Sequence, residues 1–351
     1  MTLWTRRHFF QGALGLALAR ALPAGSQPRP LRLVHWSDLH WGGKDDDARA
    51  CLEAWERGLK PGPDLILMTG DHGDNGAGEG DFEQRLAGLW GRLLPYLQGN
   101  SAPLLLCLGN SDFRNNYQTD SNTLAETWEI SRRVLGTRYY LDELGNGRRE
   151  AAGLTWISLN SQIFSPKNRH PGASEQGSRS LRWLREQLAA SSGPAVILTH
   201  IPPCIDLYVG GSAWRPQDCR AFWQIVESHP RPCWVMGGHF HRNEVHAGRQ
   251  GKTPVPLLVA GSLSRKYDYA PNWRSWSWQV GPEGLIDCRY RLHYPGHADW
   301  EAEYRIDDLQ AFARQLEDPA FLSRYRRDLF AHHSLAERTE PWPIREQFWI
   351  D

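Results

Sequence analysis

The 351-residue chain has no excess charge of either sign, since 40 lysines and arginines balance 40 aspartates and glutamates. No overall field therefore favours nucleic acid or an anionic membrane surface as a partner. No apolar run approaches the roughly 20 residues of a membrane-spanning helix, so a permanent membrane anchor is not expected. No Gly-rich loop ends in Gly-Lys-Ser/Thr, which disfavours nucleotide-driven phosphoryl transfer of the P-loop type.

The six cysteines form no Cys-x-x-Cys pair and no zinc-ribbon spacing, which argues against a structural zinc site. Cys107 and Cys233 lie in or beside apolar strand-like runs, where a free thiol packs as a small buried hydrophobe. An oxidising compartment would permit a bridge between Cys204 and Cys219, but the number of cysteines fixes no pairing.

Short apolar runs alternate with longer amphipathic stretches from Leu31 onwards. Such alternation predicts strands separated by helices, in a chain whose 40% hydrophobic content is typical of a globular protein. The expected strands cover residues 31–36, 64–69, 103–108, 154–159, 195–199 and 233–236. The expected helices cover residues 48–59, 82–97, 124–135, 180–190 and 217–227. The pattern indicates an α/β domain with a mixed sheet.

After Gly238 the pattern changes to short strand-like pieces without helices between them, at 255–260, 275–280 and 284–292. A second sheet that closes the same core accounts for these pieces. Residues 306–327 are expected to form two helices. No repeat or low-complexity linker marks a second independent domain. We therefore expect one domain over residues 25–300, with residues 301–351 as a C-terminal helical extension packed on it.

The N-terminus carries Arg6 and Arg7, a short apolar stretch at 13–19 and then small residues around Ala24. It resembles a twin-arginine export signal over residues 1–24. The alternative is an ordinary first helix with two solvated arginines. The resemblance implies an exported protein, periplasmic or secreted, whose mature chain starts near Gly25.

Side chains that can bind metal ions follow the ends of the expected strands. They are Asp38 and His40 after the first run, Asp71 after the second, Asn110 after the third, His200 after the fifth, and His239 and His241 after the sixth. Ligands of open α/β sheets bind in the crevice outside the carboxyl ends of the strands, so these loops are expected to converge. A glycine directly precedes Asp71, Asn110 and His239, and glycine lets the chain turn sharply near an ion. Each fragment alone is commonplace, and the complete ordered set is the signal.

This order resembles the calcineurin-like metallophosphoesterase superfamily, whose pattern runs Asp-x-His, Gly-Asp, Gly-Asn, His and Gly-His-x-His. The resemblance implies a layered sandwich of two central mixed β-sheets flanked by helices, with residues 25–300 as the catalytic domain. It implies two divalent metal ions, one held by Asp38, His40 and His241, the other by Asn110, His200 and His239, with Asp71 bridging. Imidazole and carboxylate ligands suit Zn, Fe or Mn, and a bridging carboxylate reduces the repulsion between cations about 3.5–4 Å apart.

Further motifs resemble the acid-sphingomyelinase-like branch of that superfamily, at residues 108–112, 115–117, 158–160, 198–203 and 261–264. The resemblance implies hydrolysis of a phosphodiester or phosphomonoester in a small-molecule or lipid substrate. Two adjacent cations lower the pKa of a shared water towards neutrality and neutralise charge on the phosphoryl oxygens. A nuclease or polyphosphatase on the same centre is an alternative, although the balanced charge makes nucleic acid less favoured.

Ser111 departs from the pattern, because many relatives have His after the Gly-Asn pair. A serine hydroxyl is not a proton donor of near-neutral pKa. His72 and Asp112 are the candidate catalytic groups in its place, or else they orient a metal ligand by hydrogen bonding. Arg114 and Asn116 are the candidate substrate-binding residues. The serine also motivates another hypothesis, a metal-bearing phosphate-binding protein with weak or lost hydrolysis.

Overall fold

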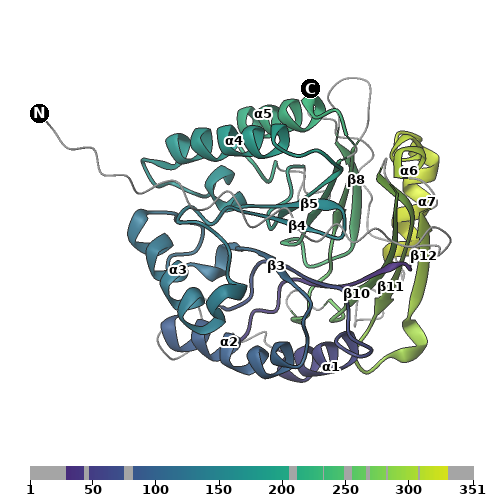
Figure 1. The fold of residues 1–351 in the computed structure, drawn as a ribbon, viewed down its shortest axis with the longest axis horizontal. Helices are drawn as coiled ribbons and strands as arrows, with labels where there is room; N and C mark the ends of the chain where they lie inside the picture. Colours follow the sequence, from purple (N-terminus) through teal and green to yellow (C-terminus); the bar gives the residue numbers. More distant parts are fainter. Residues whose placement is uncertain are drawn as a thin grey trace, which may run out of the picture.

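A computed structural model describes residues 29–42, 47–74, 82–204, 212–231, 233–248, 255–265, 269–281, 284–306 and 309–330. The predicted export signal, residues 1–24, lies outside the described residues. In Figure 1 two sheets face each other, with helices on their outer sides. None of the described helices is long and apolar enough to cross a membrane.

The first sheet has the strand order β12-β11-β10-β1-β2-β3. Its strands are β1 (Leu31–Trp36), β2 (Leu65–Thr69), β3 (Leu104–Cys107), β10 (Trp273–Gly281), β11 (Gly284–His293) and β12 (Ala302–Ile306). The first three are parallel to one another, and β10, β11 and β12 extend the sheet in antiparallel pairs.

The second sheet has the order β4-β5-β6-β7-β9-β8. Its strands are β4 (Gly147–Ala151), β5 (Leu154–Leu159), β6 (Ala195–Thr199), β7 (Cys233–Gly237), β8 (Glu244–Gly248) and β9 (Val255–Val259). The four inner strands are parallel, and β4 and β8 are antiparallel strands at its two edges.

The prediction of an α/β fold with two mixed sheets is confirmed, but the late strands do not form a sheet of their own. β9 pairs with β7 in the second sheet, and β10 pairs with β1 in the first. The sequence pattern also missed β4, β8 and β12. These are edge strands that contain charged residues, for example Glu244 and Arg305, so they form no continuous apolar run.

Helices cover both outer faces, with α1, α2 and α3 on the first sheet and α4 and α5 on the second (Figure 1). Their bounds are α1 (Ala48–Gly58), α2 (Phe82–Gln98), α3 (Ser121–Leu135), α4 (Ala173–Ala189) and α5 (Pro216–Ser228). Helix α3 begins earlier than the apolar pattern predicts because Asp120 caps it, accepting hydrogen bonds from the backbone of Asn122 and Thr123. Short 3₁₀ helices cover Asn110–Asp112, Gly136–Arg138, Ser161–Phe164 and Ala298–Trp300.

The C-terminal part forms α6 (Leu309–Gln315) and α7 (Pro319–Phe330), which agrees with the two helices expected there. Helix α6 contacts β9 and β11, and α7 contacts β8, so both lie against strands of the sandwich. The domain limits themselves stay a prediction.

The space between the sheets is the main core, and tryptophans contribute much of it. Trp156 of β5 and Trp278 of β10 stack across the two sheets with centroids 5.6 Å apart and planes at 8°. In the parallel strands alternate residues face this core and the helices, for example Leu67 inwards and Met68 outwards. Both faces are therefore apolar, which is why these strands appear as continuous hydrophobic runs.

All six cysteines lie within the described residues and are buried free thiols. Cys219 donates a hydrogen bond to the carbonyl of Pro203 at 3.3 Å and forms no bridge with Cys204.

Candidate metal centre

The loops that follow β1, β2, β3, β6 and β7 carry all seven predicted ligands, and the structure brings these side chains together. Asp38, His40, Asp71 and His241 form one group whose ligand atoms all lie within 4.8 Å of one another. Asp71, His200 and His239 form a second such group. The amide oxygen of Asn110 lies 3.2 Å from Nε2 of His200, beside the second group. Asp71 is common to both groups, as a bridging ligand must be.

The spacing between ring nitrogens fits metal ions. Nε2 of His40 lies 3.2 Å from Nε2 of His241, and Nδ1 of His239 lies 3.2 Å from Nε2 of His200. With Zn–N bonds of about 2.0–2.1 Å and tetrahedral angles, two nitrogens on one ion lie about 3.3 Å apart. Without a proton or a cation between them, such facing lone pairs would repel each other. The donor set therefore fits divalent cations.

Surrounding hydrogen bonds orient these side chains. Nδ1 of His200 donates to the carbonyl of Thr69 at 2.8 Å, which leaves Nε2 as the nitrogen that faces the centre. A carboxylate oxygen of Asp38 accepts from the hydroxyl of Ser37 at 2.5 Å and from the backbone N–H of His239 at 2.9 Å. The loop after β1 is thereby tied to the loop after β7.

The backbone is unusual at the same places. Within the described part of the chain seven non-glycine residues have a positive φ, and five of them are predicted ligands. Those five are Asp38 (52°), His40 (48°), Asp71 (50°), His239 (74°) and His241 (59°). This left-handed conformation costs of order 1–3 kcal/mol per residue and persists only where the surroundings enforce it. Such strain concentrates at functional sites.

Two glycines are required for a reason other than turning. A Cβ on Gly109 would lie 2.0 Å from the backbone nitrogen of Asp71, and one on Gly238 would lie 2.0 Å from the hydroxyl oxygen of Ser37. Gly109 has φ −102°, which any residue adopts, so close approach of loops and not a special turn excludes a side chain there. Gly70 does have a positive φ, at 86°.

The electrostatics of the cluster favour a bound cation. Burial opposes ionisation of Asp71, but His200 and His40 outweigh it and hold the pKa of Asp71 well below its usual range. Burial likewise opposes the charged form of His200, but Asp71 and Asp38 raise the pKa of His200 to about 9. The field that stabilises an imidazolium at this point would also stabilise a metal cation.

Comparison with known proteins agrees with this geometry, since residues 31–243 match the family described as calcineurin-like phosphoesterase. The chain belongs to the calcineurin-like phosphoesterase family. It is 26% identical over 267 residues to the "Sphingomyelinase phosphodiesterase D" of Dictyostelium discoideum, across 69% of this chain and 60% of that protein. The predicted resemblance to the superfamily and its sphingomyelinase-like branch is thereby confirmed. This chain thus spans only about 60% of that relative's length.

The fold is also similar to that of GAP50, described as the anchor in the inner membrane complex of Plasmodium. The TM-score is 0.53 at 11% sequence identity, over 84% of this chain and 95% of that one. At this identity the likeness concerns the fold alone.

Ser111, the residue that departs from the pattern of the resemblance, lies against the carboxylate shared by both groups. Its backbone N–H donates to Asp71 at 2.7 Å and its hydroxyl donates to the other carboxylate oxygen at 3.1 Å. Ser111 therefore orients Asp71.

The predicted catalytic residues, His72 and Asp112, have fully buried side chains, and neither belongs to the two groups of ligand atoms. Asp112 accepts from the backbone N–H of His72 at 2.8 Å and of Gly109 at 2.8 Å, and lies 2.9 Å from Nδ1 of His72. It joins the loop after β2 to the loop after β3. These contacts favour the alternative in which His72 and Asp112 orient a metal ligand by hydrogen bonding. A direct catalytic role for the two residues stays a prediction.

The two predicted substrate-binding residues differ in their surroundings. Arg114 is exposed and forms an ion pair with Glu126 of α3. Asn116 is exposed and accepts a hydrogen bond from the amide of Asn110 at 2.9 Å, so it touches the metal cluster. The geometry places Asn116 better than Arg114 for contact with a substrate.

Several supporting residues escaped sequence reasoning. The hydroxyl of Ser161 accepts from the backbone N–H groups of His200 at 3.1 Å and Ile201 at 2.8 Å. The hydroxyl of Ser262 donates to the carbonyl of Asp38 at 2.8 Å. Ser262 lies in the 261–264 motif, and Ser161 directly follows the 158–160 motif. Their positions just beyond β9 and β5 were the available signal.

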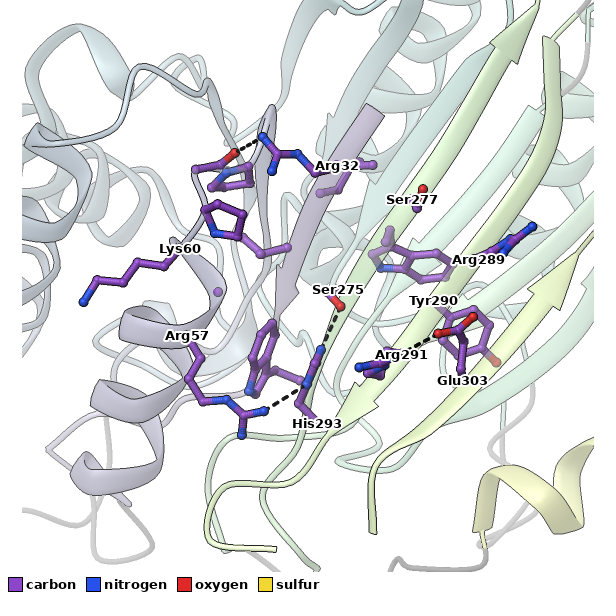
Figure 2. A pocket seen from close by; sticks show the side chains of 18 residues that line it. Arg32, Arg57, Lys60, Ser275, Ser277, Arg289, Tyr290, Arg291, His293 and Glu303 are labelled. Atoms are coloured by element: carbon purple, nitrogen blue, oxygen red, sulfur yellow. Dashed lines mark hydrogen bonds and ion pairs between the residues drawn. The ribbon is translucent and has the colours of Figure 1, made fainter. Parts of the chain in front are cut away.

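A separate cavity of about 480 Å³ lies between the end of α1 and the strands β1, β10 and β11 (Figure 2). None of the seven predicted metal-binding residues lines this cavity. Its basic side chains are mostly paired, Arg57 with Glu301 and Arg291 with Glu303. The chemistry suggested by the sequence therefore belongs to the metal cluster and not to this cavity.

Proposed function

We propose that this chain is a hydrolase that cleaves a phosphodiester or phosphomonoester with two divalent metal ions. The single observation that carries the proposal is the pair of donor groups that share Asp71, with ring nitrogens at the spacing of metal ligands. Membership of the calcineurin-like phosphoesterase family supports it.

In this proposal Asp38, His40 and His241 hold one ion, Asn110, His200 and His239 hold the other, and Asp71 bridges. Zn, Fe and Mn suit this mixture of imidazole, carboxylate and amide donors. When bound, two such ions would lower the pKa of a nearby water towards neutrality and would neutralise charge that develops on the phosphoryl oxygens.

The protein's own residues give the centre its geometry. Ser111 and the backbone around it hold Asp71, while Asp112 ties together the loops that carry Asp71 and Asn110. Such contacts around the ligands typically contribute about 10–100-fold to metal affinity or activity. The proposed substrate is a small-molecule or lipid phosphate ester, and the proposed location is outside the cytoplasm.

The test uses protein loaded with Zn²⁺, Mn²⁺ or Fe²⁺ and assayed on p-nitrophenyl phosphate and bis(p-nitrophenyl) phosphate. Elemental analysis should find two ions per chain, and chelation should abolish turnover. Asp71→Ala should lose both ions and activity, whereas Asp299→Ala, at an exposed position, should keep them. Turnover that survives Asp71→Ala together with exhaustive chelation would refute the proposal.

A second candidate is a phosphate-binding protein whose hydrolysis is weak, and Ser111 is the observation that favours it. Ser111→His restores a group with a near-neutral pKa and should raise the rate by up to about 10²–10⁴-fold if proton donation limits it. Thermal melting of the variant checks that the larger side chain is accommodated. Good activity in the parent with no gain in the variant rejects this candidate.

A further inference from the structure

The candidate metal centre opens on the side of His239. Of the seven predicted ligands, all of them in the described residues, six are buried and His239 is half-buried. A substrate phosphate must therefore reach the centre past His239. The groups beside that histidine are the ones that meet whatever is attached to the phosphate.

Tyr117 borders the opening. Its ring meets that of His239 edge to face, with centroids 6.1 Å apart and planes at 88°. Tyr117 also has a φ of 65°. Of the described non-glycine residues with a positive φ, five are predicted ligands and Ala152 lies in the turn between β4 and β5, so Tyr117 is the remaining one. A bulky residue held in this conformation is a sign of functional placement.

Lys167 covers Tyr117. Its ammonium group donates to the phenol oxygen at 3.2 Å and lies 4.8 Å from the ring centroid, within the range of a cation–π contact. The backbone at Lys167 is also tied to the residue after Tyr117, because the side chain of Gln118 donates a hydrogen bond to the carbonyl of Lys167 at 3.3 Å. Lys167 is exposed and has no carboxylate partner among the described residues, in contrast to Arg114, which is paired with Glu126.

We propose that Lys167, seated on Tyr117, selects phosphate esters whose attached group is negatively charged and disfavours those that carry a quaternary ammonium. The inference rests on the proposed function, since it needs the phosphate to bind at the metal centre. An aromatic face that already holds an ammonium group offers no cation–π site to a second cation, which instead meets like charge. A carboxylate or a second phosphate on the substrate, placed beside Tyr117, would instead form an ion pair with the ammonium group of Lys167.

Three phosphomonoesters of similar size separate these cases: phosphocholine, glycerol 2-phosphate and 3-phosphoglycerate. Their dissociation constants from the metal-loaded protein are measured by titration calorimetry, together with the release of phosphate. We expect 3-phosphoglycerate to bind tightest and phosphocholine weakest. The metal ions contribute to this order in every variant, so the change on mutation is the quantity that tests Lys167.

The ratio of the dissociation constants of phosphocholine and 3-phosphoglycerate tests the proposal. Lys167→Glu should change this ratio on the order of tenfold in favour of phosphocholine binding at low salt. About 1 M salt should reduce the change. Lys60→Glu makes the same charge change on the separate cavity of Figure 2 and should leave the ratio as in the parent. An unchanged ratio in Lys167→Glu, or an equal shift in Lys60→Glu, overturns the inference. Because binding is measured directly, a parent that binds in the expected order but hydrolyses no ester contradicts the proposed function alone.

Discussion

At the scale of single residues, the candidate centre depends on a few positions where loops approach within van der Waals contact. Gly109 lies directly against Asp71, and Gly238 lies against Ser37. The nearest atoms are backbone or short side chains, which cannot move aside as the end of a long side chain can.

Gly109→Ala should therefore displace Asp71 and lower the affinity for metal by at least about 10–100-fold. Gly88→Ala is the matched control, since Gly88 is exposed in α2 with no atom within 4 Å of its Cβ position. That change should instead stabilise the fold by about 0.5–1 kcal/mol. Titration calorimetry and thermal melting measure the two effects. Normal metal binding by Gly109→Ala would contradict the close approach.

The raised pKa of His200 makes metal binding dependent on pH. In the metal-free protein the pKa is about 9, so at pH 7 the imidazole carries a proton that a metal ion must displace. Asp71, whose pKa is held well below its usual range, stays ionised throughout. Apparent affinity should therefore rise by about tenfold per pH unit from pH 7 towards pH 9 and then level off.

Calorimetry in buffers with different ionisation enthalpies measures this proton release directly. Close to one proton should leave per ion bound to the His200 group at pH 7. An affinity that is constant between pH 7 and pH 9 would show that the imidazole is neutral before metal binds.

At the scale of elements, the sandwich depends on contacts between sheets whose strands are distant in sequence. Trp278 of β10 stacks on Trp156 of β5 and also contacts Trp234 of β7. Since β10 pairs with β1, this cluster fixes the position of the loop after β1 relative to the loops of the second sheet.

Trp278→Ala should reduce the free energy of unfolding by about 3–5 kcal/mol, because it removes a fully buried ring between the sheets. Ser277→Ala, one residue earlier on the opposite face of β10, should change it by less than about 0.5 kcal/mol. Chemical denaturation measures both. Similar small losses in the two variants would mean that the tryptophan cluster does not hold the sheets together.

At the scale of the whole molecule, export decides where the substrate is found. The predicted signal depends on Arg6 and Arg7, which a receptor recognises by geometry and hydrogen-bond donors and not by charge alone. Replacing both with Lys should block processing near Ala24 and leave folded protein in the cytoplasm. A fused reporter that is active only after export detects this. Equal export of the double-Lys form would exclude the twin-arginine route and leave the metal centre unaffected.

The sequence by itself determined the inner strands and the positions of the seven candidate ligands. Parallel strands buried on both faces are continuous apolar runs, and ligands follow directly where those runs end, as at Asp71 after β2 and His200 after β6. Both signals are local in the chain. The edge strand β4, with its charged residues, carries no such signal.

Only the tertiary structure decided which sheet each late strand joins, because the residues of β9 and β10 predict strands but do not specify the partner strand, and pairing joins distant segments. It also decided the supporting contacts of Ser161 and Ser262, and the placement of Lys167 on Tyr117 beside His239. Each of these depends on the approach of separate loops, and such proximity is set by the packing of the two sheets and not by any spacing along the chain.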